Sequence, residues 1–196
     1  MKNLQQIYSA KDSEIFIFSI DQNISMLNSA IIPKEQLEKI LKYKEDRDRV
    51  KRVLARTFLF EYCQKKYNLK DFAFEYTKNQ KPKFKHSNLN FSISYSKNII
   101  AIALSKKYII GVDIEFLEPS TVSPKVASEF MNDKELTTFL QMNKNNRNRY
   151  FYEVWTTKES LLKAKGNGLS VNPKAVDNTL GNILYFKEYV INFTII

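Results

Sequence analysis

Apolar and polar residues in the first half of the chain predict one round of strand, helix and strands. The apolar run at 14–20 predicts a strand, and a basic segment of helical periodicity follows from 34 to 67, directly after a proline. Runs at 72–76 and 90–95 predict two further strands, the second with alternating apolar and hydroxyl residues.

The second half of the chain repeats this order. Two apolar strands at 99–104 and 108–116, joined by the polar residues 105–107, are typical of a hairpin. A second helical region covers 124–165 and is interrupted by the polar stretch 143–148.

Two strands, near 183–187 and 189–195, close the chain. Because the order of elements is doubled, we predict an α+β protein of two pseudo-symmetric α/β halves, residues 1–105 and 106–196. Each half is expected to be a small, mainly antiparallel sheet packed on a long helix. A ligand site at the interface between the halves is then natural.

Charge and composition narrow the classes of partner. Lys and Arg number 31 against 21 Asp and Glu, a formal net charge of +10, so the surface attracts polyanions and leaves their class open. The first residues lack a signal-peptide apolar run, and no apolar run could span a bilayer, so we expect a cytoplasmic protein. Cys63 and His86, each the single residue of its kind, argue against an intramolecular disulfide and against histidine-based catalysis.

The most informative strand carries two acids, in the sequence Gly-Val-Asp-Ile-Glu-Phe at 111–116. Asp113 and Glu115 share one face of the strand, while Val112 and Ile114 point the other way, into the core. Two neighbouring carboxylates favour a hard cation such as Mg²⁺. Taken alone, the pattern slightly favours a half-exposed strand with two solvated acids, because Asp-x-Glu is common.

The second acidic segment is the helix that ends at Gly166, a residue suited to a left-handed C-cap. Glu159 and Lys163 lie four apart on its polar stripe, so an i,i+4 ion pair on a solvated face is the plain alternative. The chain has four glycines, and Gly111, Gly166 and Gly168 flank the two acidic segments. Glycine used so sparingly indicates special backbone geometry or a close ligand approach.

Basic residues offer candidate anion contacts. Arg49, Arg52 and Arg56 fall on one helical stripe, and arginine binds phosphates through paired hydrogen bonds. Lys81 precedes a proline after a turn-like segment. A solvated basic face is the alternative reading of the arginines.

Three segments together, 91–96, 111–115 and 155–163, resemble in order and spacing the 4'-phosphopantetheinyl transferases. The chain length is similar to that of the surfactin-synthetase type, a monomer of two similar halves, and the resemblance covers roughly residues 45–170. It implies transfer of the phosphopantetheine arm of coenzyme A to a serine of an apo acyl or peptidyl carrier protein, with release of adenosine 3',5'-bisphosphate.

The resemblance also implies roles for acidic and basic residues. Asp113, Glu115 and Glu159 would hold Mg²⁺ against the coenzyme A pyrophosphate, and Glu159 would help to deprotonate the serine. Lys163 would stabilise charge on the phosphate, with assistance from Lys158.

Four further residues are implied in nucleotide binding. Arg52 and Lys81 would grip phosphates, and Ser94 and Tyr95 would line the same pocket. Tyr95 departs from the family, which usually has histidine there, and Gln80 stands where glycine is common.

The expected partner is an acidic carrier protein, steered by the positive charge of the chain. Fatty acid, polyketide and peptide synthetase carriers all stay open, as does Mn²⁺ in place of Mg²⁺; no nucleic-acid or membrane partner is expected. Two alternatives remain: a non-enzymatic, basic nucleic-acid-binding protein, and an inactive family member that binds coenzyme A.

Overall fold

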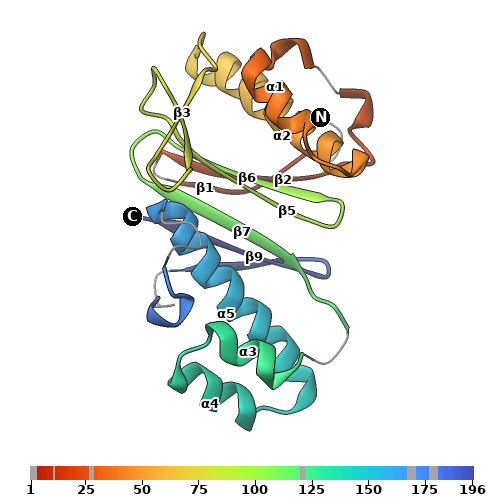
Figure 1. Cartoon of the computed structure of the whole chain (residues 1–196), viewed down its shortest axis with the longest axis vertical. Helices are drawn as coiled ribbons and strands as arrows, with labels where there is room; N and C mark the ends of the chain where they lie inside the picture. Colours follow the sequence, from red (N-terminus) through yellow and green to blue (C-terminus); the bar gives the residue numbers. More distant parts are fainter. Residues whose placement is uncertain (1–3, 11, 27–28, 120–121, 167–170, 177–180) are drawn as a thin grey trace.

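The fold stacks two sheets between two groups of helices (Figure 1). The computed structural model describes residues 4–10, 12–26, 29–119, 122–166, 171–176 and 181–196. From top to bottom in Figure 1 lie α1 and α2, the sheet of β1, β2, β5 and β6, the sheet containing β7 and β9, and finally α5 with α3 and α4. Antiparallel sheets, each packed on a long helix, confirm the predicted α+β class.

The N-terminal sheet has the order β1-β2-β6-β5 and is antiparallel throughout. Its strands are β1 (Gln5–Ala10), β2 (Ser13–Ser19), β6 (Ile99–Ser105) and β5 (Asn90–Ser96). α2 (Asp46–Tyr67) packs on one face, with α1 (Lys34–Leu41) beside it.

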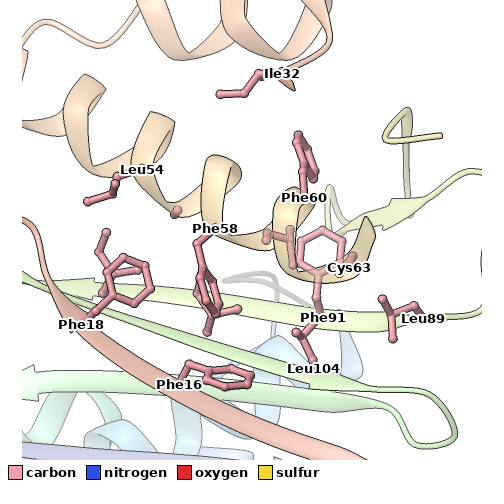
Figure 2. Packing of buried hydrophobic residues seen from close by; sticks show 14 of the residues in the cluster. Phe16, Phe18, Ile32, Leu54, Phe58, Phe60, Cys63, Leu89, Phe91 and Leu104 are labelled. Atoms are coloured by element: carbon pink, nitrogen blue, oxygen red, sulfur yellow. The ribbon is translucent and has the colours of Figure 1, made fainter. Parts of the chain in front are cut away.

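Aromatic side chains fill the core between α2 and this sheet. Phe16 and Phe18 of β2 meet Phe58 of α2 with ring centroids 5.3 and 5.1 Å apart (Figure 2). Such tilted or edge-to-face ring pairs add to the free energy of apolar burial. Cys63 lies in the same cluster, and burial raises the pKa of its thiol to about 12, which confirms a core residue.

Short elements complete this half. β3 (Phe74–Tyr76) and β4 (Pro82–Phe84) form a small antiparallel ribbon, and two 3-10 turns, η1 (Ile24–Met26) and η2 (Ser29–Ile31), follow β2.

The C-terminal sheet has the order β7-β9-β8. It consists of β7 (Ile110–Phe116), β9 (Tyr189–Ile195) and β8 (Asn182–Phe186), and α5 (Lys144–Lys165) packs against it. α3 (Pro124–Phe130) and α4 (Asp133–Gln141) cover the N-terminal part of α5, and η4 (Pro173–Ala175) contacts α3.

A second core joins the two sheets face to face. Ile15 and Ile17 of β2 pack there with Val112 and Ile114 of β7 and with residues of β6 and β9. Because strand side chains alternate, β2 feeds its odd-numbered residues into this core and its even-numbered ones into the core beneath α2. This core is shared by residues 1–105 and residues 106–196, so the division of the chain into these two halves remains a proposal.

Gly111 allows α5 to approach β7 closely. A Cβ atom at this position would lie 1.9 Å from the carbonyl oxygen of Ser160 and 2.5 Å from the amide nitrogen of Ala164. The glycine therefore serves helix packing. Gly166 caps α5 with φ of 68°, as predicted, whereas Gly168 lies outside the described residues.

One predicted pairing is wrong. Strands 99–104 and 108–116 form no hairpin, because β6 and β7 belong to different sheets and residues 106–109 carry the chain from one layer to the next. β6 pairs with β2 and β5, and β7 pairs with β9.

The helix boundaries also differ from those predicted. The region 34–67 breaks at residues 42–45, and the region 124–165 forms three helices, with α5 already beginning at Lys144. Asn143 caps α5 by accepting a hydrogen bond from the Asn146 amide, so the asparagine-rich stretch starts the helix instead of interrupting it. Within the described residues, no helix has the length and apolar character of a membrane span.

Candidate active site

The candidate site lies where the edge strand β5 meets β7. Serine hydroxyls join the two strands: Ser92 Oγ accepts a hydrogen bond from the Val112 amide at 3.1 Å, and Ser96 Oγ accepts one from the Phe116 amide at 2.9 Å. These bonds satisfy the amides on the edge of β7 opposite β9. The serines of β5 therefore fix the strand that carries the acids.

Asp113 is the buried centre of the acidic cluster. Its side chain is 3% exposed, and Oδ1 accepts hydrogen bonds from Ser94 Oγ at 2.7 Å and from Lys163 Nζ at 2.5 Å. Lys163 also donates to Ser94 at 3.0 Å. The predicted strand residue and the predicted helix residue therefore meet directly, through an ion pair between β7 and α5.

Glu115 and Glu159 lie in the electrostatic field of Asp113. Burial, and next the charge of Asp113, raise the pKa of Glu115 to about 7, against a hydrogen bond from Ser96 and the charge of Lys163. Burial and the same aspartate also raise the pKa of Glu159. The three acids predicted from sequence are thus coupled, and the cluster carries more negative charge than Lys163 alone neutralises.

The donor set of this cluster suits a hard divalent cation. Asp113 Oδ2 and Glu159 Oε1 are buried and have no hydrogen-bond partner in the described part of the chain. Carboxylate oxygens are the ligands that Mg²⁺ prefers, together with phosphates of a bound substrate. Among the described residues, no group of three His, Cys, Asp or Glu side chains is arranged to hold a metal ion, and Lys163 pairs with Asp113.

A cavity of about 290 Å³ opens between α2 and the C-terminal end of α5, beside this cluster. Its polar lining combines residues from both halves: Arg52, Arg56, Asn79, Gln80, Lys81, Ser92, Tyr95 and Lys163. Of the predicted nucleotide contacts, Ser94 lies behind this lining, 5% exposed and bound to Asp113. The cavity is cationic and suits an anionic ligand.

Lys81 ties the cavity to the helix and strand of the C-terminal half. Its Nζ donates to the carbonyl oxygens of Ala164 at 2.8 Å and Ile110 at 3.2 Å. Burial, and next the charge of Lys83, lower the pKa of Lys81 to about 8. Lys81 therefore links the cavity wall to both α5 and β7.

The stripe of three arginines divides in the structure. Arg49 binds the carbonyl oxygens of Tyr43 and Lys44, whereas Arg52 and Arg56 line the cavity. Helical spacing had placed Arg56 on the same stripe as Arg52, and both line the cavity. Tyr43, which stacks on Arg52, was not selected as a site residue from the sequence.

Lys158 lies apart from the residues that line the cavity. Its buried Nζ pairs with Glu135 Oε2 at 2.8 Å and donates to the carbonyl oxygens of Pro173 at 2.9 Å and Phe130 at 3.1 Å. These three partners satisfy its donors. In this structure Lys158 connects α3, α4 and η4 to α5, next to Glu159.

A buried polar network supports α5 from behind the site. Asn192 of β9 donates to Thr157 Oγ1 at 2.6 Å and accepts from Ser160 Oγ at 3.2 Å, and Ser160 lies 2.9 Å from Thr194 Oγ1. Hydrogen bonds of this kind fix the rotation of the helix. They hold Glu159 and Lys163 on the side that faces Asp113.

Comparison with known proteins agrees with this geometry. The model of a family described as the 4'-phosphopantetheinyl transferase superfamily matches residues 109–187. The chain is 26% identical over 172 residues to 4'-phosphopantetheinyl transferase gsp of Aneurinibacillus migulanus, covering 86% of this chain and 71% of that protein.

Two relatives come from Bacillus subtilis. Identity is 34% over 147 residues to 4'-phosphopantetheinyl transferase ffp and 28% over 145 residues to 4'-phosphopantetheinyl transferase Sfp. Each match covers 72% of this chain and 63% of the relative, so the chain spans less than two thirds of either.

Proposed function

We propose that the chain is a member of the 4'-phosphopantetheinyl transferase superfamily and that it transfers the phosphopantetheine arm of coenzyme A to a serine of an apo carrier protein. Adenosine 3',5'-bisphosphate is the other product. The observation that carries the proposal is the meeting of Asp113, Glu159 and Lys163 beside a cationic cavity.

Bond changes in this reaction are simple to state. The serine Oγ forms a bond to the phosphorus next to the pantetheine arm, and the bond from that phosphorus to the bridging pyrophosphate oxygen breaks. The serine proton leaves to a base, and the bridging oxygen leaves with the adenosine 3',5'-bisphosphate. Such transfers depend mainly on positioning and on charge neutralisation.

The acids of the cluster would hold the metal and take the proton. Asp113, Glu115 and Glu159 are the proposed Mg²⁺ ligands, and bound Mg²⁺ would neutralise charge on the pyrophosphate. Glu159, which has a buried oxygen without a partner, is the proposed acceptor of the serine proton.

Cationic side chains would bind and orient the pyrophosphate. Lys163, which pairs with Asp113 in this structure, would bind a phosphate oxygen of the ligand. Arg52 and Lys81 line the same cavity and would bind the remaining phosphates. For Lys158 we propose a positioning role, since protein groups already occupy its donors.

The test is a mass measurement on carrier proteins. The chain is incubated with coenzyme A and Mg²⁺ and with apo carriers of fatty acid, polyketide and peptide synthetases. We expect at least one carrier to gain the mass of one phosphopantetheine group. If no carrier gains this mass but calorimetry shows that the chain binds coenzyme A, the chain is instead an inactive coenzyme A-binding protein.

A second candidate function rests on a separate basic surface. A broad cavity of about 900 Å³ is lined by Lys83, Lys85, Lys106 and Lys107, with Glu75 as the acid among its lining residues. A surface of this kind suits a nucleic-acid backbone. A salt-sensitive mobility shift with single-stranded DNA or RNA would support this alternative.

A further inference from the structure

Arg52 lies between two tyrosine rings. The carbon of its guanidinium group is 3.8 Å from the ring centroid of Tyr43 and 5.0 Å from that of Tyr95. Tyr43 belongs to the loop between α1 and α2, and Tyr95 belongs to β5. Aromatic faces attract a cation and match the flat guanidinium, so the two rings restrict its orientation.

The guanidinium of Arg52 remains available to a ligand. Across the described residues, no carboxylate forms an ion pair with Arg52 or Arg56, and Arg52 Nε and Arg56 Nη1 are buried without partners. Arg52 is among the charges that lower the pKa of Arg56, after burial. Asp48, which pairs with Lys51, also feels the charge of Arg52, but the two adjacent guanidinium groups outweigh it among the described residues and indicate a place for an anion.

These two arginines separate two cavities. Both line the cavity of about 290 Å³ that contains Lys163, and both line a neighbouring one of about 330 Å³ that contains Tyr43 and Tyr76. The guanidinium of Arg52 is therefore part of the wall between them. A phosphate group bound there could be contacted from either cavity.

The ring of Tyr43 is itself held in place. Its backbone carbonyl oxygen accepts a hydrogen bond from Arg49 Nη1 at 2.7 Å, and its amide donates to the Ile40 carbonyl at 3.2 Å. The side chain of Tyr43 is 41% exposed, so it contributes little to the core. Its contact with Arg52 is thus separable from folding.

From this geometry we infer that Tyr43 and Tyr95 are positioning residues, which hold Arg52 as a pre-oriented receptor for a phosphate group of the nucleotide ligand. The inference rests on the proposed function. Orientation before binding removes the rotational freedom that a solvated arginine would lose on contact with the anion. It also gives Tyr95, in the place where relatives usually have histidine, a role that uses its aromatic face and the hydrogen bond between its hydroxyl and Arg52.

Calorimetry with adenosine 3',5'-bisphosphate tests the clamp. Tyr43→Leu and Tyr95→Leu are expected to weaken binding by about three- to thirtyfold, the range of a cation–aromatic contact. Tyr43→Phe keeps the ring and is expected to bind within about twofold of wild type. Tyr95→Phe keeps the ring but loses the hydrogen bond between its hydroxyl and Arg52, so its affinity is expected to lie between those of wild type and Tyr95→Leu. Arg52→Lys keeps the charge, loses the flat face and is expected to weaken binding at least as much as the leucine variants.

A matched control exists elsewhere in the chain. Tyr185 stacks on Arg149 at 4.1 Å and is 43% exposed, but neither residue lines the two cavities. Tyr185→Leu should leave affinity unchanged, and thermal unfolding of each variant checks that it is folded. Since Tyr43→Leu removes a half-exposed ring, it stays informative even if Tyr95→Leu unfolds.

Two results would overturn the inference. Leucine variants that bind like wild type would remove the clamp, and a Tyr43→Phe variant as weak as Tyr43→Leu would show that the hydroxyl group, and not the ring, acts at that residue. If the leucine variants bind adenosine 3',5'-bisphosphate more weakly but the protein modifies no carrier, the clamp stands and the proposed transferase function is rejected. If the protein modifies a carrier but its affinity does not depend on the two rings, the transferase function stands and the clamp is rejected.

Discussion

Lys163 Nζ lies 2.5 Å from Asp113 Oδ1, at the place where a cation would be held. The ammonium also donates to Ser94 and lines the cavity, so it connects the acidic cluster with the ligand space. An internal cation and an incoming metal ion would compete for the same carboxylate.

Removal of this ammonium should therefore help a metal ion to bind the ligand-free protein. Lys163→Met is expected to tighten Mn²⁺ binding by about tenfold, because one positive charge leaves a buried carboxylate. Transfer should fall at least a hundredfold, because the same lysine is proposed to bind the phosphate. Mn²⁺ paramagnetic resonance measures the affinity directly.

Lys165→Met is the matched control for this prediction. Lys165 is an exposed lysine in the last turn of the same helix, and it is absent from the cavity lining. The variant should change neither affinity nor transfer by more than about twofold. Weaker Mn²⁺ binding in Lys163→Met than in this control would show that no competition exists.

Close packing of α5 on β7 gives a stability prediction. Gly111→Ala forces a methyl group against the backbone of Ser160 and Ala164 and is expected to lower the free energy of unfolding by about 3 kcal/mol. Gly166→Ala makes a milder contact, with Lys81 Cδ at 3.2 Å and Cβ at 3.4 Å, and should cost only about 1 kcal/mol, mainly through the strained positive φ. Urea unfolding of both variants ranks them, and equal costs would contradict the close approach.

Glu115 predicts a pH dependence of stability in metal-free buffer. Its pKa in the folded state is raised from 4.5 to about 7, so the folded protein binds more protons than the unfolded chain between these values. Stability contributed by this group is therefore present below about pH 4.5 and is lost as pH rises towards 7.

The glutamine variant tests that sign. Glu115→Gln should flatten the fall in urea midpoint between pH 4.5 and 7, measured with a chelator present. Glu118→Gln, at a half-exposed residue that pairs with Lys97, should leave the slope as in wild type. An unchanged slope in Glu115→Gln would show that this carboxyl does not titrate in the predicted window.

The buried pair of Lys158 and Glu135 separates a positioning role from a catalytic one. Lys158→Met leaves a buried carboxylate unpaired and is expected to lower the free energy of unfolding by about 3–5 kcal/mol. The double variant Lys158→Met, Glu135→Leu removes both charges and should recover most of that loss. If the double variant is folded and binds ligand normally but transfers no phosphopantetheine, Lys158 acts in the chemistry.

Local pattern was sufficient to predict the acidic strand. Alternation placed Asp113 opposite the core residue Val112, and helical spacing placed Glu159 and Lys163 on one stripe. Both rules involve residues a few positions apart. They predict which side chains share a face, and the structure adds what that face meets.

Long-range pairing was beyond these rules. The strand at 110–116 pairs with β9, nearly eighty residues later, so the short link at 105–107 was mistaken for a hairpin turn. Stacking of Arg52 between Tyr43 and Tyr95 likewise joins two distant segments. Gly111 signalled a close approach, but the sequence could not show that a helix is what approaches.

Masses of apo carrier proteins, incubated with coenzyme A and Mg²⁺, test the central claim most directly. Wild-type protein should add one phosphopantetheine group to a carrier, while Asp113→Ala and Glu159→Ala should add none. Thermal unfolding checks that both variants are folded. Full modification by either folded variant would contradict the proposal that these two carboxylates hold the metal and accept the proton.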